Sequence, residues 1–92
     1  MHFEYDPAKS EANAEKHGID FEEAQTLWDD PHLLTFGLQC KEESRWALLA
    51  RYAGAVWFAV YTMRGEATRI ISVRRAIKGE VSLYDRQRNA DS

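Results

Sequence analysis

The sequence predicts an α+β domain in which two N-terminal helices precede a four-stranded antiparallel sheet in meander order and a third helix follows it. The strongest observation is a hairpin signal: two runs rich in β-branched and aromatic residues, Val56–Met63 and Thr68–Arg75, flank the polar break Arg64–Ala67. Two shorter strand-like runs lie upstream, and apolar residues recur at helical spacing near both ends of the chain. At 92 residues the chain has room for one domain, spanning residues 1–92.

The first helix is expected over Pro7–His17. Asp6 supplies an N-cap before a proline at the first helical position, and Gly18 supplies the stop. The apolar stripe of this segment is thin and consists mainly of Ala8, Ala12 and Ala14. We therefore expect the helix to lie on the surface of the sheet.

A second helix is expected to begin at Asp20. The segment Asp20–Glu23 resembles a capping box with aspartate in place of serine or threonine. A buried helical face then follows, formed by Ala24, Leu27 and Trp28. The helix should end before Pro31, because proline disfavours helix in the residue that precedes it.

The first two expected strands are Leu33–Leu38 and Arg45–Arg51, separated by the charged turn Lys41–Ser44. The short connections make each strand antiparallel to the next. The run Val56–Met63 is almost wholly apolar, as expected of a central strand covered on both faces. The predicted core contains Trp28, Leu48, Val60 and Ile71.

The single cysteine, the N-terminal residues and the length of the apolar runs argue against a secreted or membrane-spanning protein. Cys40 is the only cysteine, which excludes an internal disulfide and a cysteine-based zinc site and suits a reducing compartment. The first residues are acidic and lack the apolar run of a signal peptide. The longest apolar run, Ala53–Met63, is too short to span a bilayer. We expect a cytoplasmic protein without a membrane segment.

Charge is distributed unevenly along the chain. Residues 1–44 carry eleven acidic and three basic side chains, a net charge of −8, whereas residues 45–92 carry nine basic and four acidic ones, a net charge of +5. All eight arginines lie at or after Arg45. This asymmetry favours a phosphate-bearing partner for the basic half, because the guanidinium fork matches phosphate oxygens. The alternative is that the two halves neutralise each other within the fold.

The sequence contains few groups suited to catalysis. His2, His17 and His32 lie far apart without ligand spacing, so we expect no metal site and no cofactor. Glycine-rich phosphate loops and nucleophile motifs are also absent from the sequence. The remaining candidates are arginines and their prospective partners: Glu43, Arg45, Arg64, Arg69, Arg74, Arg75, Glu80 and Tyr84.

Strand alternation sorts the arginines of the last expected strand. Arg69 and Arg75 are an even number of residues apart and should share one face, with Arg74 on the other. One face must pack against the helices, so at least one arginine should be buried or at the rim of the sheet, held by a carboxylate. The alternative is that Arg69 and Arg74 form internal ion pairs with acids of the N-terminal half.

The C-terminal helix is predicted by the helical spacing of apolar residues from Ala76 to Tyr84, interrupted by Gly79. Glu80 and Tyr84 are four residues apart and therefore adjacent on one helix face. They are either functional neighbours or an ordinary helix pair in which Tyr84 closes the core.

Several motifs spread over the chain resemble those of the BrnT family of bacterial toxins. They are Phe3-x-Tyr5-Asp6-x4-Glu11-x-Asn13-x2-Lys16-His17-Gly18-Ile19-x-Phe21-x2-Ala24, then Glu43-x-Arg45, then Arg69-Ile70-Ile71-Ser72-x-Arg74-x-Ala76-x3-Glu80-x3-Tyr84. The resemblance covers nearly the whole chain and implies a RelE-like fold and RNA cleavage. It also implies neutralisation by a partner antitoxin called BrnA, with operator DNA bound only through the complex, and leaves room for a homo-oligomer. Gly79 departs from the family, whose final helix is usually rich in charged helix formers.

The residues and the resemblance agree on a mechanism. Without a metal, RNA can be cut by its own 2′-hydroxyl, which requires in-line positioning, charge stabilisation, a base and an acid. The arginines Arg64, Arg69 and Arg74 are the candidates for charge stabilisation. Proton transfer is open to Glu80, Tyr84 or His17, and RNA binding to Glu43, Arg45 and Arg75. The rival hypothesis is a catalytically silent module whose basic face holds an acidic protein or a nucleic acid.

Overall fold

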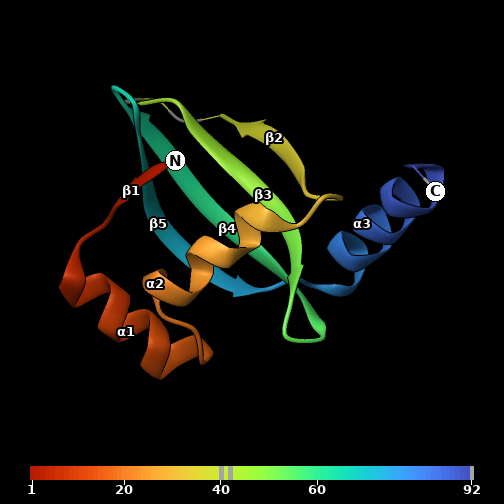
Figure 1. Cartoon of the computed structure of the whole chain (residues 1–92), viewed down its shortest axis with the longest axis horizontal. Helices are drawn as coiled ribbons and strands as arrows, with labels where there is room; N and C mark the ends of the chain where they lie inside the picture. Colours follow the sequence, from red (N-terminus) through yellow and green to blue (C-terminus); the bar gives the residue numbers. More distant parts are fainter. Residues whose placement is uncertain (40, 42, 92) are drawn as a thin grey trace.

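The structure, a computed structural model, describes residues 1–39, 41 and 43–91. A curved sheet forms its centre, with helices packed against it (Figure 1). The elements in chain order are β1 (His2–Glu4), α1 (Pro7–His17), α2 (Phe21–Ala24), the 3-10 helix η1 (Gln25–Asp29), β2 (Leu34–Leu38), β3 (Arg45–Tyr52), β4 (Ala55–Arg64), β5 (Ala67–Arg75) and α3 (Lys78–Asp91).

The sheet has five strands in the order β1-β5-β4-β3-β2. Strands β2 to β5 form an antiparallel meander, whereas β1 pairs parallel with β5, with Phe3 opposite Thr68. The predicted RelE-like arrangement of two N-terminal helices and four antiparallel strands is therefore wrong. The strand that was missed is three residues long, too short to show a period. A residue far away in the sequence holds this strand in place, because the Phe3 ring packs edge-on against Trp28 with ring centroids 5.0 Å apart.

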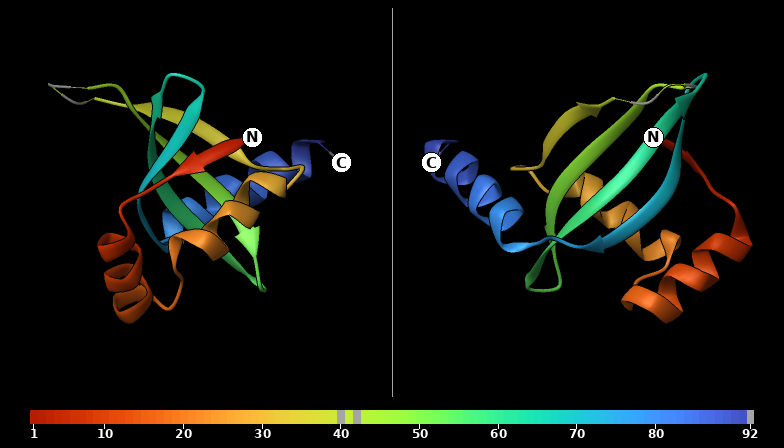
Figure 2. Two further views of the ribbon diagram at one scale, coloured as in Figure 1. Left: turned by 60° about the vertical axis from the view of Figure 1, so that its left-hand side comes forward. Right: turned by 180° about the vertical axis from the view of Figure 1, so that it is seen from behind.

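The predicted hairpin is confirmed. Strands β4 and β5 are antiparallel and are joined by a short turn in which Gly65 has a φ of 61°. Strand β4 lies at the centre of the sheet, as its apolar sequence indicated. The prediction that both of its faces are covered is wrong, because α1, α2 and η1 pack on one face and α3 lies to one side of the other face (Figure 2, right). The turn predicted at Lys41–Ser44 includes Glu42, which lies outside the described residues.

Helix α1 has the predicted bounds and caps. Asp6 Oδ1 accepts a hydrogen bond from the Ala8 amide at 2.9 Å, and Gly18 ends the helix with a φ of 77°. Its buried side chains, however, are Ser10 and Asn13 and not the alanines of the expected stripe. The second predicted helix is also different, because its α-helical part ends at Ala24 and continues as the 3-10 helix η1.

Helices α1, α2 and η1 cover one face of the sheet, which we call the helical face (Figure 1). Its core includes Phe21, Leu27, Leu48, Ile70 and Val73, all fully buried. Among the predicted core residues, Leu48 is fully buried, whereas Trp28, Val60 and Ile71 are only partly buried.

Among the described elements, α3 alone packs on the opposite face of the sheet, at one end of it. There α3 packs Tyr84 into a small cluster with Leu49 and Val56. Seen from behind, α3 lies to the side of the sheet and leaves the middle of β4 and β5 uncovered (Figure 2, right). We call this surface the open face.

A β-bulge in β5 decides which side chains reach the open face. Val60 pairs with Ser72, but Tyr61 pairs with Ile70, so Ile71 is an extra residue in β5. The extra residue reverses the alternation along the strand. The register therefore puts Arg69, Ser72 and Arg74 on the open face with Phe58 and Val60, and Arg75 on the helical face with Trp57. The predicted grouping, Arg69 with Arg75 against Arg74, is wrong, because strict alternation does not hold across a bulge.

Candidate functional site

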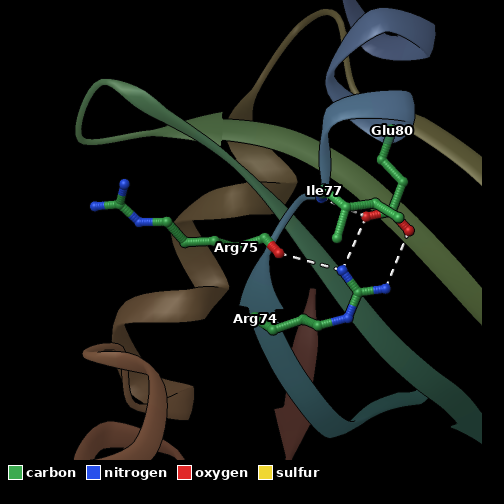
Figure 3. Close-up of polar contacts among 4 residues, drawn as sticks. All are labelled: Arg74, Arg75, Ile77 and Glu80. Carbon is green, nitrogen blue, oxygen red and sulfur yellow. Dashed lines mark hydrogen bonds and ion pairs between the residues drawn. The ribbon is translucent and has the colours of Figure 1, made fainter.

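Arg74 and Glu80 form a two-pronged ion pair where β5 leads into α3. Arg74 Nη1 donates to Glu80 Oε1 at 2.8 Å, and Arg74 Nη2 donates to Glu80 Oε2 at 3.0 Å (Figure 3). Arg74 Nη1 also donates to the Arg75 carbonyl oxygen at 3.1 Å. The Ile77 amide, just before α3, donates to Glu80 Oε1 at 2.9 Å, as in one half of a capping box. The start of α3 thus orients the Glu80 carboxylate, and that carboxylate orients the Arg74 guanidinium.

The surroundings of this pair keep both groups charged. The hydrogen bonds from Arg74 lower the pKa of Glu80, and the hydrogen bond to Glu80 raises the pKa of Arg74. The Arg74 guanidinium also lies 4.1 Å from the centroid of the Phe58 ring, a cation–π contact on the open face. The result is an oriented cation beside an aromatic ring on a partly exposed surface.

Arg69 lies further along the open face. It is opposite Thr62 on β4 and opposite Glu4 on the short strand β1. Its Nη1 is 3.9 Å from Glu4 Oε1, a long and partly exposed ion pair that contributes little to stability. Glu4 is an acid of the N-terminal half, as the internal ion-pair alternative expects for Arg69. The acid that holds Arg74 comes instead from α3.

Arg75 points away from the Arg74–Glu80 pair (Figure 3). Its guanidinium lies 5.4 Å from the centroid of the Trp57 ring, on the helical side of the sheet. The side chains of Arg74 and Arg75, which are neighbours in sequence, thus lie on opposite faces of the sheet.

The other candidate arginines lie at the hairpin end of the sheet. Arg64 is exposed beside the β4–β5 turn and pairs with Ala67, which is seven residues or about 23 Å along β5 from Arg74. Arg45 is at the start of β3, where its Nε is 3.2 Å from Glu43 Oε1. The fold therefore does not bring the sequence-predicted residues into one cluster.

Tyr84 is in the core, with 1% of its surface exposed. Its hydroxyl donates to Asp30 Oδ2 at 2.6 Å, and burial together with this bond raises its pKa to about 12. Asp30 also accepts from the amides of Arg51 and His32, each at 2.8 Å. Burial alone would raise the pKa of Asp30, but these hydrogen bonds leave it lowered. The contact ties α3 to the loop after η1, as the core-closing alternative for Tyr84 expects.

His17 lies in the last turn of α1 and lines a cavity of about 290 Å³ at the edge of β5. The same cavity is lined by Lys9 and Lys16 from α1 and by Ile71 and Ser72 from β5. Ser72 belongs to the open face, two residues before Arg74. His17 belongs to the acidic half of the chain, but in the fold it lies near β5, which carries Arg69, Arg74 and Arg75.

Two larger cavities flank α3. One, of about 560 Å³, is lined by residues that include Arg51, Arg88 and Asp85. The other, of about 450 Å³, shares Arg51 and Arg88 and adds Asp29 and Asp30. Both thus combine arginines with carboxylates.

The described part of the chain offers neither a cluster of metal ligands nor a membrane-spanning helix. Within residues 1–39, 41 and 43–91, no three His, Cys, Asp or Glu side chains form a group that could hold a metal ion. Among the helices of the same described residues, none is long and apolar enough to cross a membrane.

Comparison with known proteins assigns the family. A family model described as "Ribonuclease toxin, BrnT, of type II toxin-antitoxin system" matches residues 5–80 of the 92. The chain belongs to the BrnT family. It is therefore a member of a family of ribonuclease toxins from type II toxin–antitoxin systems. No curated protein matches the chain. Within this BrnT chain, the family match includes Arg74, Glu80 and His17 and ends before Tyr84.

Sequence reasoning missed one residue that shapes this BrnT site. The Asn13 carboxamide donates to the Val73 carbonyl oxygen at 2.9 Å and accepts from the Val73 amide at 3.2 Å, as a neighbouring strand would. It also donates to the Ile19 carbonyl oxygen at 2.8 Å. Asn13 thus docks α1 on β5 one residue before Arg74. Asn13 stands in the motif quoted for the family resemblance, but no role followed from that motif. A further signal is an asparagine in the middle of a helix, where it is a poor helix former.

Proposed function

We propose that this protein is a metal-independent endoribonuclease that binds single-stranded RNA across the open face of its sheet. The observation that carries the proposal is the Arg74–Glu80 pair beside Phe58, a fixed cation next to an aromatic ring. The family description supplies the ribonuclease activity, and the arrangement around Arg74 supports this location.

Aromatic side chains on the open face support single-stranded RNA as the ligand. Phe36 and Phe58 are only partly buried, and their ring centroids lie 6.3 Å apart. Unstacked bases stack on such rings, and each base stacked on an aromatic side chain is worth about 1–3 kcal/mol. Arg74 would then meet the phosphate that follows a base held at Phe58.

The reaction proposed needs only the RNA, side chains of the protein and water. The 2′-oxygen forms a bond to the adjacent phosphorus as the bond from phosphorus to the 5′-oxygen breaks. A base takes the proton of the 2′-hydroxyl and an acid gives a proton to the departing 5′-oxygen, so the products are a 2′,3′-cyclic phosphate and a 5′-hydroxyl. Arg74 stabilises the extra negative charge on the phosphorus-bound oxygens, as donors preorganised toward developing charge do.

The roles of the candidates follow from their contacts. Both carboxylate oxygens of Glu80 are occupied by Arg74, so Glu80 acts as a positioning residue. Tyr84 is buried and bonded to Asp30, so it supports the fold. Of the three candidates for proton transfer this leaves His17, which lines the cavity beside Ser72. His17 would take the proton of the 2′-hydroxyl, while a water molecule at this exposed surface would give a proton to the departing 5′-oxygen. Histidine is the side chain best suited to proton transfer near neutral pH.

The outlying candidates receive smaller roles. Arg69, on the open face, would hold a second phosphate of the RNA. Arg64, Arg45 and Arg75 would contribute to long-range attraction of the RNA, and Glu43 to the orientation of Arg45.

A cleavage assay tests the proposal. Purified protein should cut single-stranded RNA in EDTA and leave 2′,3′-cyclic phosphate ends, read by mass spectrometry. Arg74→Ala should lower the rate at least about tenfold, as loss of a charge-stabilising donor does, and His17→Ala by about 100-fold or more. Glu80→Gln should lower the rate less than Arg74→Ala, and not at all in the Arg74→Ala background, because it acts through Arg74. Arg86→Ala, which removes an exposed arginine of α3, is the control.

Three results would contradict the proposal. Cleavage that requires an added divalent metal ion would refute the mechanism. Folded protein that leaves RNA intact would support the silent binding module instead. Full activity of Arg74→Ala would move the site away from the open face.

We also propose that a BrnA-like antitoxin encoded next to this protein neutralises it. The family is defined by toxin–antitoxin systems, which implies an antitoxin, and the exposed arginines and the free edge of β2 offer charge pairing and strand addition. Co-expression of the neighbouring reading frame should give a co-purifying complex that leaves RNA intact and restores growth. A neighbour that neither co-purifies nor restores growth would remove this assignment while leaving RNA cleavage untouched.

A further inference from the structure

The charged side chains that line the cavity at the edge of β5 are lysines. The charged or titratable side chains along it are Lys9, Lys16 and His17, and no carboxylate of the described residues lines it. Both lysines are exposed. This local positive surface is unexpected, because it lies in the acidic half of the chain.

The charges of α1 are sorted by the helical period. Lys9 and Lys16 are seven residues apart, or two turns, and therefore share one side of the helix with Asn13, which docks on β5. Glu11 and Glu15 lie four residues apart on the opposite side and are exposed. The docking of α1 thus turns its lysines toward β5 and its acids away.

The cavity and the open face share one residue, Ser72. Ser72 lines the cavity and also belongs to the open face, where it is exposed two residues before Arg74. The bulge residue Ile71 forms part of the same wall. Bulges are common beside active sites, where they redirect side chains. A strand of RNA leaving Arg74 therefore meets α1 after passing Ser72.

The larger cavities beside α3 suit a phosphate chain less well. One carries Arg51, Arg75 and Arg88 with Asp85, and the other carries Arg51 and Arg88 with Asp29 and Asp30. These carboxylates repel phosphates. Of the three cavities, the smaller one is the one whose described lining has no carboxylate, which favours it as the continuation of the RNA path.

We propose that Lys9 and Lys16 bind backbone phosphates of the RNA beyond the scissile phosphate, so that the strand crosses the edge of β5 at Ser72. This inference rests on the proposed ribonuclease function and assigns it a second, non-catalytic phosphate-binding subsite. The two lysines supply point charges that attract successive phosphates, and His17 lines the same cavity.

The test measures RNA binding without cleavage. A 2′-O-methylated single-stranded RNA of about 12 nucleotides lacks the attacking hydroxyl, so affinity can be followed against salt concentration. Each phosphate contact contributes about −0.7 to the slope of log K against log salt. Lys9→Gln and Lys16→Gln should each make the slope shallower by about 0.7, and the double variant by about 1.4.

Two control variants separate a contact from a general charge effect. Lys41→Gln removes the same charge from an exposed position outside the cavity, and Glu11→Gln changes the charge on the other side of α1. Neither should alter the slope. Equal changes in the slope with Lys41→Gln and Lys16→Gln would overturn the inference, as would no change with either lysine of the cavity.

The same variants distinguish this inference from the ribonuclease proposal. Wild-type protein that cuts RNA, together with cavity variants of unchanged slope, would overturn only the subsite. Wild-type protein that neither binds nor cuts RNA would overturn both. Circular dichroism and urea unfolding of each variant confirm that the exposed substitutions leave the fold intact.

Discussion

Replacing Asn13 by alanine should destabilise the protein more than any change at an exposed position of α1. The wild-type carboxamide satisfies three backbone groups, which are the Ile19 carbonyl, the Val73 carbonyl and the Val73 amide. Val73 is fully buried, and Asn13 itself is 8% exposed. Alanine leaves these three groups without their partner at the junction of α1 and β5.

The magnitude follows from those three groups. A buried polar group that loses its partner costs about 1–3 kcal/mol, so three cost at least about 3 kcal/mol. The better helix propensity of alanine returns about 0.6 kcal/mol. We expect a net loss of at least about 2 kcal/mol in the free energy of unfolding, from a total on the order of 5–10 kcal/mol for a domain of this size.

Urea unfolding followed by tryptophan fluorescence measures this loss. The control is Glu11→Ala on the same helix, which should stay within about 0.5 kcal/mol of wild type. A loss below about 1 kcal/mol for Asn13→Ala would refute the reasoning, because the carboxamide would then not be supporting the edge of β5.

The variant Asn13→Asp distinguishes the stability lost with the hydrogen bonds from the stability lost with the volume of the side chain. Aspartate keeps the size of the side chain and an acceptor for the Val73 amide, but it no longer donates and instead faces the carbonyl oxygens of Ile19 and Val73. Because the charged form is disfavoured in the folded state, the pKa of the new carboxyl should be raised. The loss of stability relative to wild type should therefore be large at pH 7 and smaller near pH 4. A loss that is the same at both values would refute the hydrogen-bond account.

Three further predictions concern stability. Tyr84→Phe should cost about 2 kcal/mol at pH 7, because a hydrogen bond to the Asp30 carboxylate is lost; urea unfolding measures it, and a neutral result would contradict a structural role. Since the pKa of Tyr84 is raised to about 12, the unfolded chain ionises first, so wild-type stability should fall from pH 10 to pH 12 and its advantage over Tyr84→Phe should vanish there. Gly65→Ala should cost about 1 kcal/mol of stability, because Gly65 has a φ of 61°. Gly79→Ala in α3 should instead stabilise the protein by about 0.5–1 kcal/mol, because alanine is the better helix former. Urea unfolding midpoints of the two variants that shift in the same direction would contradict this.

The sequence alone determined the features that depend on local conformation. Asp6 and Gly18 set the bounds of α1, because capping groups and a left-handed stop act within one turn. Gly65 and the apolar runs around it set the β4–β5 hairpin for the same reason. The motifs around Arg74 and Glu80 indicated the family, which the match over residues 5–80 confirmed.

The tertiary structure decided which chemical groups meet. The bulge at Ile71 moved Arg69 and Arg74 to one face, and a bulge depends on the pairing of two strands and not on one strand's pattern. The parallel strand β1 was held by an aromatic contact far away in sequence. The Asn13 side chain forms hydrogen bonds with the Val73 carbonyl and amide, the backbone groups that a further strand at the edge of β5 would otherwise pair with. These features rest on hydrogen bonds and packing between segments far apart in the sequence, such as Asn13 and Val73, which are 60 residues apart, and their energies exist only once the chain has folded.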